Sequence, residues 1–403
     1  MARQLDLRTG RPLWTRSRAP KVAVRRLTRD VSADVVVVGM GVSGAMLAEA
    51  LTGAGLGVVM LDRRGPILGS TMATTALVQF EIDQPLTRLK RKIGTAKAER
   101  AWRRSRLAMV NLAGRVEELG IRCDAVAKPS LYLAGDMLDG AALRSEAEAR
   151  RLVGIHSAVL PAAEIAERFG IAARAALLSH GNLALDPRKL TAGLLDLAAA
   201  RGARLYAPTE AVAFEEDGGR VHIATSDGPT ASARFLVLAT GYELLDGVPN
   251  AGHSVLSTYA LATGRQPRLD GRRLPLVWEA SDPYLYFRGT ADGRLICGGE
   301  DETFADEERR DALLGRKIAA ISRKLARRLP AADTAADYAW AGSFGASDTG
   351  LPSIGRLPRR RRSFAVMGYG GNGITYSQIA SELVLAAIQG GDDIDADLYR
   401  LPA

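Results

Sequence analysis

The segment DVVVVGMGVSG, residues 34–44, decides the fold of this chain. Its four consecutive valines predict a strand that is buried on both faces, as in a parallel sheet. Glycines follow at positions 39, 41 and 44, which is the G-x-G-x-x-G spacing. We expect Gly39 to allow a tight turn, Gly41 to let a pyrophosphate approach the backbone, and Gly44 to let the next helix pack closely on the strand.

The residues that follow complete this unit. A helix is predicted over 45–51, and a second apolar strand over 58–61 ends at Asp62. A carboxylate at that position can accept hydrogen bonds from the ribose hydroxyls of an adenine dinucleotide, while the helix N-terminus faces the pyrophosphate. An isolated G-x-G-x-x-G is weak evidence. The strand, helix, second strand and acid together predict a Rossmann-like dinucleotide-binding domain.

Composition limits the other functional classes. The chain has 403 residues, of which 47% are hydrophobic, so it can bury two domain cores. Its net charge of +9 could attract an anionic partner, but the basic residues are interspersed with acidic ones, which favours a general enrichment in arginine. Cys123 and Cys297 imply no disulfide framework, the four histidines lack metal-ligand spacing, and no apolar run could span a membrane. We therefore expect a cytoplasmic protein with no metal and no nucleic-acid partner.

The first 33 residues contain a pattern that invites another interpretation. Arg25-Arg26 precedes an apolar run, as in a twin-arginine export signal. The only apolar run available is the strand in 34–44, and cleavage there would destroy the dinucleotide-binding unit. We interpret residues 1–33 as a basic surface extension.

Three further stretches carry a family resemblance. Gly69-Ser70-Thr71 follows Asp62, the run FLVLATG occupies residues 235–241, and a glycine cluster occupies residues 368–375. A dinucleotide fold with these features resembles the FAD-dependent amine and amino-acid oxidase family, which includes D-amino-acid, glycine and sarcosine oxidases. The resemblance covers most of the chain, but it does not identify the substrate. It implies an α/β fold with a Rossmann-like FAD-binding domain and an α+β substrate domain that contains an antiparallel sheet.

The resemblance also assigns segments and residues. It places the FAD-binding domain in 34–85, 181–252 and 341–403, and the substrate domain in 86–180 and 253–340. Neither cysteine falls on the sarcosine oxidase attachment position, so FAD is expected to bind without a covalent bond. The implied cofactor-binding residues are Gly39, Gly41, Val42, Ser43, Gly44, Asp62, Arg63, Arg64, Gly69, Ser70, Thr71, Val212, Ala239, Thr240, Gly241, Gly371, Asn372, Gly373, Ile374 and Thr375.

The closing cluster is itself a second G-x-G-x-x-G, at Gly368, Gly370 and Gly373. No second strand with a terminal acid follows it, so the context of a nicotinamide site is missing. We interpret it as a helix N-terminus whose dipole and free amides face the electron-rich end of the flavin.

Departures from the family pattern bear on the substrate. Gln79, Phe344 and Thr375 stand where relatives place the cations that hold a substrate carboxylate. Glu300 stands where a histidine would be, either as a counter-charge for an amine or as an exposed acid in a turn. The residues expected to form the substrate pocket are Gln79, Tyr259, Tyr284, Tyr286, Arg288, Glu300, Phe344 and Thr375. We name no catalytic acid or base.

These departures predict oxidation of the C–N bond of a small amine by hydride transfer to FAD. The alternative is a dehydrogenase of an amino acid or 2-hydroxy acid, with Arg288 holding the carboxylate on the strand face shared with Tyr284 and Tyr286. Ile296 replaces the lysine that helps oxygen react in sarcosine-type oxidases, so the acceptor is oxygen or an unidentified carrier. From another class, a flavin-holding module could bind RNA or a partner through the basic helical stretch 86–118, which a solvated helix face explains equally well.

Overall fold

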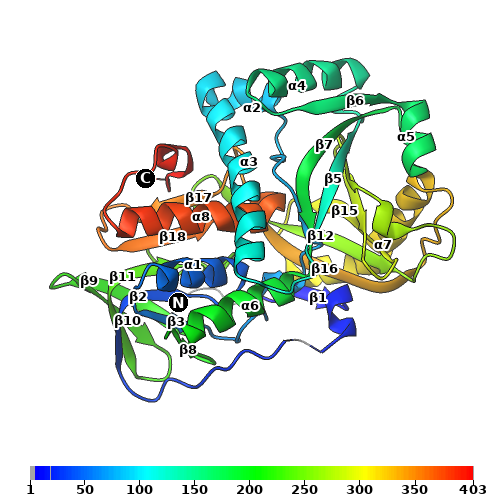
Figure 1. Ribbon diagram of the computed structural model, residues 1–403. Helices are drawn as coiled ribbons and strands as arrows, with labels where there is room; N and C mark the ends of the chain where they lie inside the picture. The colour runs from blue at the N-terminus through cyan, green and yellow to red at the C-terminus, as the bar shows by residue number, and fades with distance from the viewer. Residues whose placement is uncertain (1–4, 19, 403) are drawn as a thin grey trace.

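The computed structural model describes residues 5–18 and 20–402, which form two β-sheets with helices on their outer faces (Figure 1). One sheet has a parallel centre and the other is mostly antiparallel. This is the α/β architecture that the sequence predicts. The two sheets meet along the cavity described below.

The first sheet contains eight strands within the described residues. Six lie in the order β17 (Ser353–Arg356), β18 (Ser363–Met367), β11 (Thr230–Leu238), β2 (Val31–Val38), β3 (Val58–Leu61) and β8 (Arg204–Tyr206). The hairpin of β9 (Ala211–Asp217) and β10 (Arg220–Thr225) continues from β11. Strand β2 pairs in parallel with β11 and β3, and Val35, Val36 and Val37 are fully buried. The valine run therefore forms the centre of the sheet because its side chains are apolar on both faces.

Three helices cover this sheet. Helix α1 (Val42–Gly53) lies between α6 (Pro187–Ala200) and α8 (Gly373–Ile388). Helix α6 begins where the sequence places an N-cap, because the Asp186 carboxylate accepts the N–H groups of Arg188 and Lys189 and Pro187 occupies the first turn.

The second sheet has ten strands within the described residues. They are β1 (Arg8–Gly10), β16 (Ala336–Ser347), β12 (His253–Thr263), β15 (Leu295–Glu302), β14 (Leu285–Gly289), β13 (Leu276–Glu279), β5 (Val126–Leu133), β7 (Ala175–Ala184) and β4 (Leu77–Val78) in spatial order, with β6 (Ser157–Pro161) paired to β7. Helix α7 (Glu307–Arg328) packs on β12, β15 and β16. Helices α2 (Leu86–Ile93), α4 (Gly140–Leu152) and α5 (Ala162–Phe169) surround the far end.

Strand β16 crosses the domain boundary expected from the sequence. It belongs to the second sheet along its whole length, although residues from 341 onward were expected in the FAD-binding domain. Strand β7 likewise continues in the second sheet to Ala184, beyond the expected boundary at 180.

Residues 8–16 of the N-terminal segment belong to the second sheet rather than to a surface extension, whereas most of residues 20–30 are exposed as expected. Strand β1 pairs with β16, and the 3₁₀ turn η1 (Leu13–Arg16) buries Leu13 and Trp14. Burial of these apolar side chains holds the segment against the protein. The sequence did not indicate this burial, because arginines dominate the composition of residues 1–33.

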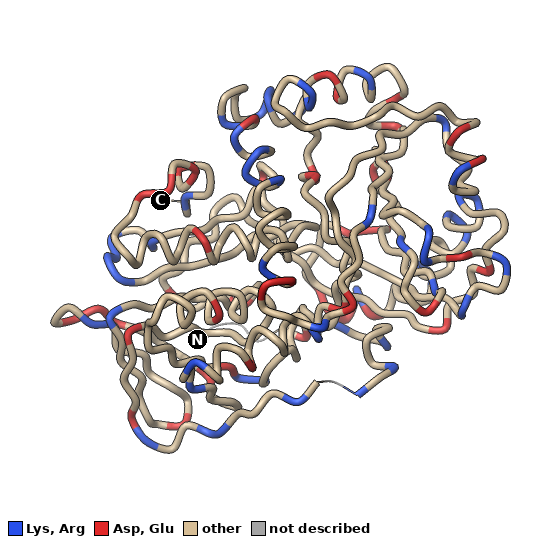
Figure 2. The backbone as a smooth tube through the Cα atoms, viewed as in Figure 1, with Lys and Arg blue, Asp and Glu red and all other residues tan. Residues whose placement is uncertain are grey.

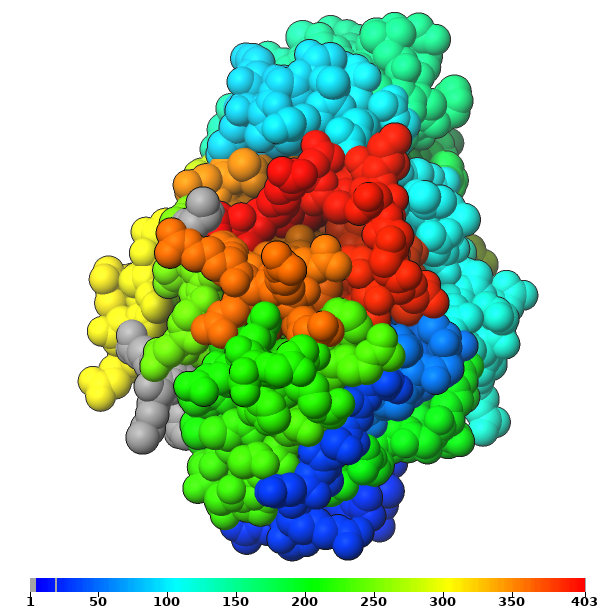
Figure 3. All heavy atoms as spheres, turned by 90° about the vertical axis from the view of Figure 1, so that its left-hand side faces the viewer, coloured from blue at the N-terminus to red at the C-terminus, as the bar shows by residue number. Residues whose placement is uncertain are grey.

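Helix α3 (Thr95–Glu118) runs between the two halves and contacts both α8 and β7. Several of its basic residues, which are blue in Figure 2, pair with acids of other segments. Arg104 pairs with Glu382 and Asp393, and Arg100 pairs with residues 395 and 397 of the C-terminal segment. Figure 3 shows that segment, in red, beside the orange strands and the cyan helical region. These pairs favour a structural role for the basic stretch.

No helix among the described residues is both long enough and apolar enough to cross a membrane.

Candidate active site

A long cavity runs between the two sheets and is lined by three classes of residue. The glycine-rich turns lie on one side, aromatic residues lie on the other, and charged residues are concentrated near the end of β3. The lining includes Leu7, Gly39, Gly41, Val42, Ser43, Asp62, Arg63, Arg64, Gly69, Ser70, Thr71, Thr75, Gln79, Asp83, Glu210, Ala211, Ala239, Thr240, Gly241, Tyr242, Glu243, Thr258, Trp278, Tyr284, Tyr286, Phe344, Tyr369, Gly371, Asn372, Gly373 and Ile374.

The first glycine motif shapes one wall of this cavity. A Cβ atom on Gly44 would lie 1.9 Å from the Gly39 carbonyl oxygen, so only glycine lets α1 pack this closely on β2. A Cβ on Gly41 would point toward the cavity and lie 3.2 Å from the Thr71 hydroxyl. The space above Gly41 is therefore available to a ligand.

Two helix N-termini open into the cavity. The N-cap residues Gly41 of α1 and Asn372 of α8 make no side-chain capping hydrogen bond, so the first-turn N–H groups are not satisfied by a cap. In the first turn of α1, the N–H of Val42 donates to the Thr71 hydroxyl at 3.1 Å. An uncapped helix N-terminus favours an anion, and the α1 terminus suits a pyrophosphate.

The end of the cavity near β3 is a network of charges. Asp62 lines the cavity, and its carboxylate accepts the N–H groups of Met40, Arg64 and Gly65. Arg63 and Arg64 both pair with the buried carboxylate of Glu243, and this hydrogen bond raises the pKa of Arg64. Ribose binding by Asp62 stays a prediction, because both carboxylate oxygens already accept hydrogen bonds from the backbone that shapes this part of the cavity.

The other end of the cavity is aromatic. Tyr284 and Tyr286 stack with ring centroids 5.6 Å apart, and Phe344 and Trp278 lie on the same lining. Burial raises the pKa of both tyrosines, so their hydroxyls remain protonated and can donate. The side-chain amide oxygen of Gln79 is buried there without a hydrogen-bond partner.

Asp83 supplies a carboxylate to this aromatic end. Its side chain is open to the cavity but surrounded by protein, and this desolvation raises its pKa. The carboxylate accepts the N–H of Gly371 at 2.8 Å. A Cβ atom on Gly370 or Gly371 would lie less than 3.0 Å from it, so the second glycine cluster allows this close approach.

Asp301 lies behind the tyrosines. Burial raises the pKa of its carboxyl group to about 6, partly offset by hydrogen bonds from the hydroxyls of Thr258 and Tyr284, while the charge of Asp83 raises it further. One of its carboxylate oxygens is buried without a partner. The aromatic end is therefore lined by one carboxylate, that of Asp83, and a second lies beside Tyr284 outside the lining.

Comparisons with known proteins agree with this geometry. Residues 34–387 match the model of the DAO family, described as FAD dependent oxidoreductase. The chain belongs to this family. Its cofactor is FAD, and the family resemblance noted in the sequence is confirmed.

Individual relatives are distant. A probable oxidoreductase OrdL from Rhizobium meliloti is 30% identical over 54% of this chain and 49% of its own length, so the chain spans about half of that relative. Gamma-glutamylputrescine oxidoreductase from Escherichia coli is 24% identical over 90% of this chain and 85% of its own. The crystal structure of glycine oxidase from Geobacillus kaustophilus superposes with a TM-score of 0.75 at 21% identity, covering 92% of this chain and 99% of the other, and shows the shared fold.

Most residues expected to bind FAD line the cavity, and three do not. Gly44 acts in packing, Ala211 occupies the lining position expected for Val212, and Thr375 is buried with its hydroxyl donating to the main-chain carbonyl of Gln79. Neither cysteine lines the cavity. The residues present fit FAD, because the uncapped α1 terminus meets the space above Gly41 and the cavity continues from there to the second glycine cluster.

Among the residues expected in the substrate pocket, Gln79, Tyr284, Tyr286 and Phe344 line the cavity. Tyr259 is buried in the core of the second sheet, with its hydroxyl donating to the Arg310 carbonyl. Arg288 lies outside the cavity, bonded to three main-chain carbonyls.

Glu300 also lies outside the cavity. It pairs with Lys317 at 3.6 Å and Lys324 at 2.5 Å. The cause is a β-bulge: the register between β12 and β15 shifts so that Glu300 and Asp301 both stand opposite Thr258, and Glu300 has a φ of 59°. The bulge turns Glu300 toward α7 and leaves Asp301 beside Thr258 and Tyr284.

Sequence reasoning missed the cavity residues Asp83, Thr258, Trp278 and Glu243. None of them lies in a recognised motif. For Asp83 the available signal is weak. It follows the segment 77–82, in which apolar residues predominate, and it lies two residues after Glu81.

Proposed function

We propose that this oxidoreductase acts on a carbon–nitrogen bond of an amine that carries no carboxylate beside the reacting carbon. Bound FAD supplies the acceptor for the hydride that leaves that carbon. The observation that carries the proposal is the charge at the aromatic end. Asp83 lines it, whereas the only lysine or arginine residues among the described lining are Arg63 and Arg64, which pair with Glu243 near β3.

Asp83 is suited to bind the amine and to take its proton. An ammonium group would pair with this carboxylate and offset its charge when the bound substrate excludes water from the cavity. The raised pKa makes the carboxylate a better proton acceptor than an exposed aspartate. The resulting neutral amine has the lone pair that stabilises the positive charge as the hydride leaves the neighbouring carbon.

The aromatic side chains would orient the substrate. Tyr284 and Tyr286 present stacked rings and Phe344 an apolar wall, which suits an alkyl chain and a cation near a ring face. Gln79 and the tyrosine hydroxyls could bind a polar group at the far end of the substrate. These features favour an alkylamine or an N-acylated polyamine.

The distant relative from Escherichia coli supports this class, because its name states that it acts on a putrescine derivative. A substrate with a free carboxylate beside the amine fits less well. No cation lines the aromatic end in the described residues, so that carboxylate would be buried without a partner.

The electron acceptor belongs to the proposal as well. Ile296, at the position of the oxygen-activating lysine of sarcosine-type oxidases, is fully buried in the core, and the described cavity lining contains no lysine. This supports slow reaction of reduced flavin with oxygen and an electron carrier as the acceptor.

Anaerobic reduction of the flavin by a panel of alkylamines, N-acylated diamines, amino acids and 2-hydroxy acids tests the proposal. We expect an amine to reduce the flavin fastest. Asp83→Asn keeps an acceptor for the Gly371 N–H but loses the charge, and should weaken binding of that amine about tenfold, roughly 1–2 kcal/mol.

Glu300→Gln is the matched control, because it removes a nearby carboxylate that lies outside the cavity, and it should leave amine binding unchanged. The proposal is wrong if a carboxylate-bearing substrate reduces the flavin fastest and Arg288→Met, rather than Asp83→Asn, abolishes its turnover.

A further inference from the structure

A second cavity lies on the other side of Thr75 from the tyrosines. It has a volume of about 250 Å³ and is enclosed by the N-terminal turn η1, the start of α6 and the ends of β5 and β14. Leu13, Trp14, Val126 and Leu185 contribute apolar walls. The remaining lining is dominated by charged groups.

Three buried cations face this space: Lys128, Arg188 and Arg288. Lys128 donates to the carbonyls of Arg272 and Leu274, and Arg288 donates to those of Thr75, Leu185 and Gly289. Within the described residues, neither cation has a carboxylate partner at ion-pair distance. Because an ammonium group has three N–H donors and a guanidinium has five, each keeps donors available.

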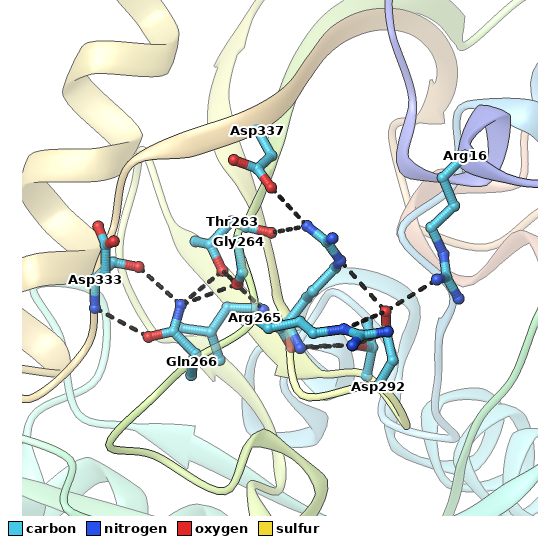
Figure 4. Close-up of polar contacts among 11 residues, drawn as sticks. Arg16, Thr263, Gly264, Arg265, Gln266, Asp292, Asp333 and Asp337 are labelled. Carbon is cyan, nitrogen blue, oxygen red and sulfur yellow. Dashed lines mark hydrogen bonds and ion pairs between the residues drawn. The ribbon is translucent and has the colours of Figure 1, made fainter.

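The acids around the cavity are already used by other groups. Three arginines share the Asp292 carboxylate (Figure 4). It lies 3.0 Å from Arg16, 3.3 Å from Arg294 and 4.0 Å from Arg265. Asp124 pairs with Lys189 at 2.7 Å.

Asp186 caps the N-terminus of α6 and lies 3.7 Å from Arg188. Among the acids that line the cavity, only Asp186 is left to balance the three buried cations, and the more distant Asp270 acts on Lys128 from outside the lining. A buried charge without a counter-charge is costly, so this arrangement favours an external anion.

The electrostatics of the cluster show the same imbalance. Burial lowers the pKa of the Arg288 guanidinium to about 10, and only Asp186 acts in the opposite direction. Burial also lowers the pKa of Lys128, and the positive charge of Arg288 lowers it further. The two cations repel each other across the cavity, and a bound anion would relieve that repulsion.

We propose that this second cavity is a binding site for a small organic carboxylate, separate from the flavin cavity. The anion would pair with Lys128 and Arg288, and its apolar body would pack against Trp14 and Leu185. Apolar walls suit an organic anion better than a bare inorganic one. The guanidinium of Arg288 therefore serves as a carboxylate anchor, but in a different cavity from that of the substrate.

Calorimetric titration of the FAD-loaded protein with benzoate, acetate and inorganic phosphate at constant ionic strength tests the site, with the flavin absorption spectrum recorded in parallel. We expect saturable binding of benzoate that leaves the flavin spectrum unchanged. Lys128→Met and Arg288→Met should each weaken it at least tenfold. The control is Arg273→Met, which removes a largely exposed arginine near the cavity that pairs with Asp270, and it should have no effect.

If those core variants fail to fold, Ala291→Glu provides a second test, because this exposed lining residue would place a competing carboxylate at the cavity and should weaken benzoate binding. The proposal is overturned by absence of saturable benzoate binding, by unchanged affinity in Lys128→Met and Arg288→Met, by tighter binding of phosphate than of benzoate, or by a flavin spectral shift that places the ligand in the first cavity.

Discussion

At the scale of single residues, Asp301 shows how backbone geometry sets chemistry. The bulge at Glu300 leaves the Asp301 carboxylate among Thr258, Tyr284 and Asp83, and the charge of Lys317 acts on its pKa in the opposite direction. Burial is the largest cause of its raised pKa, because a desolvated carboxylate favours the protonated form. The side chain therefore titrates closer to neutral pH than an ordinary aspartate.

This raised pKa predicts a pH-dependent loss of stability. The folded state holds the Asp301 proton more tightly than the unfolded state, so its stabilising effect is complete below the unfolded pKa of 3.8 and is lost as the pH rises through about 6. Between pH 5 and pH 7.5 the wild-type protein should lose about 1 kcal/mol of unfolding free energy relative to Asp301→Asn. Urea unfolding of both proteins at the two pH values measures this difference, and a constant difference would contradict the assigned pKa.

At the scale of elements, the N-terminal segment extends the second sheet and closes part of both cavities. Strand β1 pairs with β16, Leu7 lines the flavin cavity, and Trp14 lines the second cavity. The indole of Trp14 also donates to the Thr74 carbonyl at 2.7 Å. The segment thus connects the edge of the sheet to both binding sites.

Trp14→Ala should accordingly destabilise the protein by about 3–4 kcal/mol, because a large buried side chain and one hydrogen bond are lost. Val24→Ala is a suitable control in the same N-terminal region, since Val24 is an exposed hydrophobic residue, and should change stability by less than about 0.5 kcal/mol. Urea unfolding compares them. Equal effects of the two substitutions would show that the segment is not anchored through Trp14.

At the scale of the whole molecule, the flavin cavity joins the two sheets. Its lining comes from the glycine turns of the first sheet and from β12, β13 and β16 of the second. A ligand that contacts both sheets binds the folded state and not the unfolded chain, so FAD should stabilise the complete molecule.

Free FAD at 100 times its dissociation constant should therefore raise the unfolding free energy by about 2.7 kcal/mol. Gly41→Val should abolish this increase, since its side chain would occupy the space above the α1 N-terminus, and the purified variant should be colourless. Gly315→Ala is the matched control, because a Cβ there meets no atom within 4 Å. Retention of FAD by Gly41→Val would contradict the assigned pyrophosphate position.

Local sequence signals predicted the first sheet well. The four valines, the three glycines and the second apolar strand lie within 30 residues, so their pairing depends on short connections and on side chains buried on both faces. The start of α6 was likewise predictable, because Asp186 and Pro187 act on the adjacent backbone. Such features depend little on distant parts of the chain.

The substrate end was predicted less completely. Strand alternation placed Tyr284, Tyr286 and Arg288 on one face, but the cavity extends along only part of that strand, and Arg288 faces the second cavity. Alternation fails entirely at Glu300, where the bulge shifts the register. Asp83 was missed because only the fold brings it beside Gly371 and the tyrosines.

The sequence by itself determined the dinucleotide-binding unit, the family and the cofactor, because each depends on residues at short fixed spacings that act through the local backbone. The tertiary structure alone decided which carboxylates meet the substrate cavity and which cations surround the second one. Those groups come from strands and loops distant in sequence, and their charges depend on burial and neighbours that exist only after the two sheets have packed together.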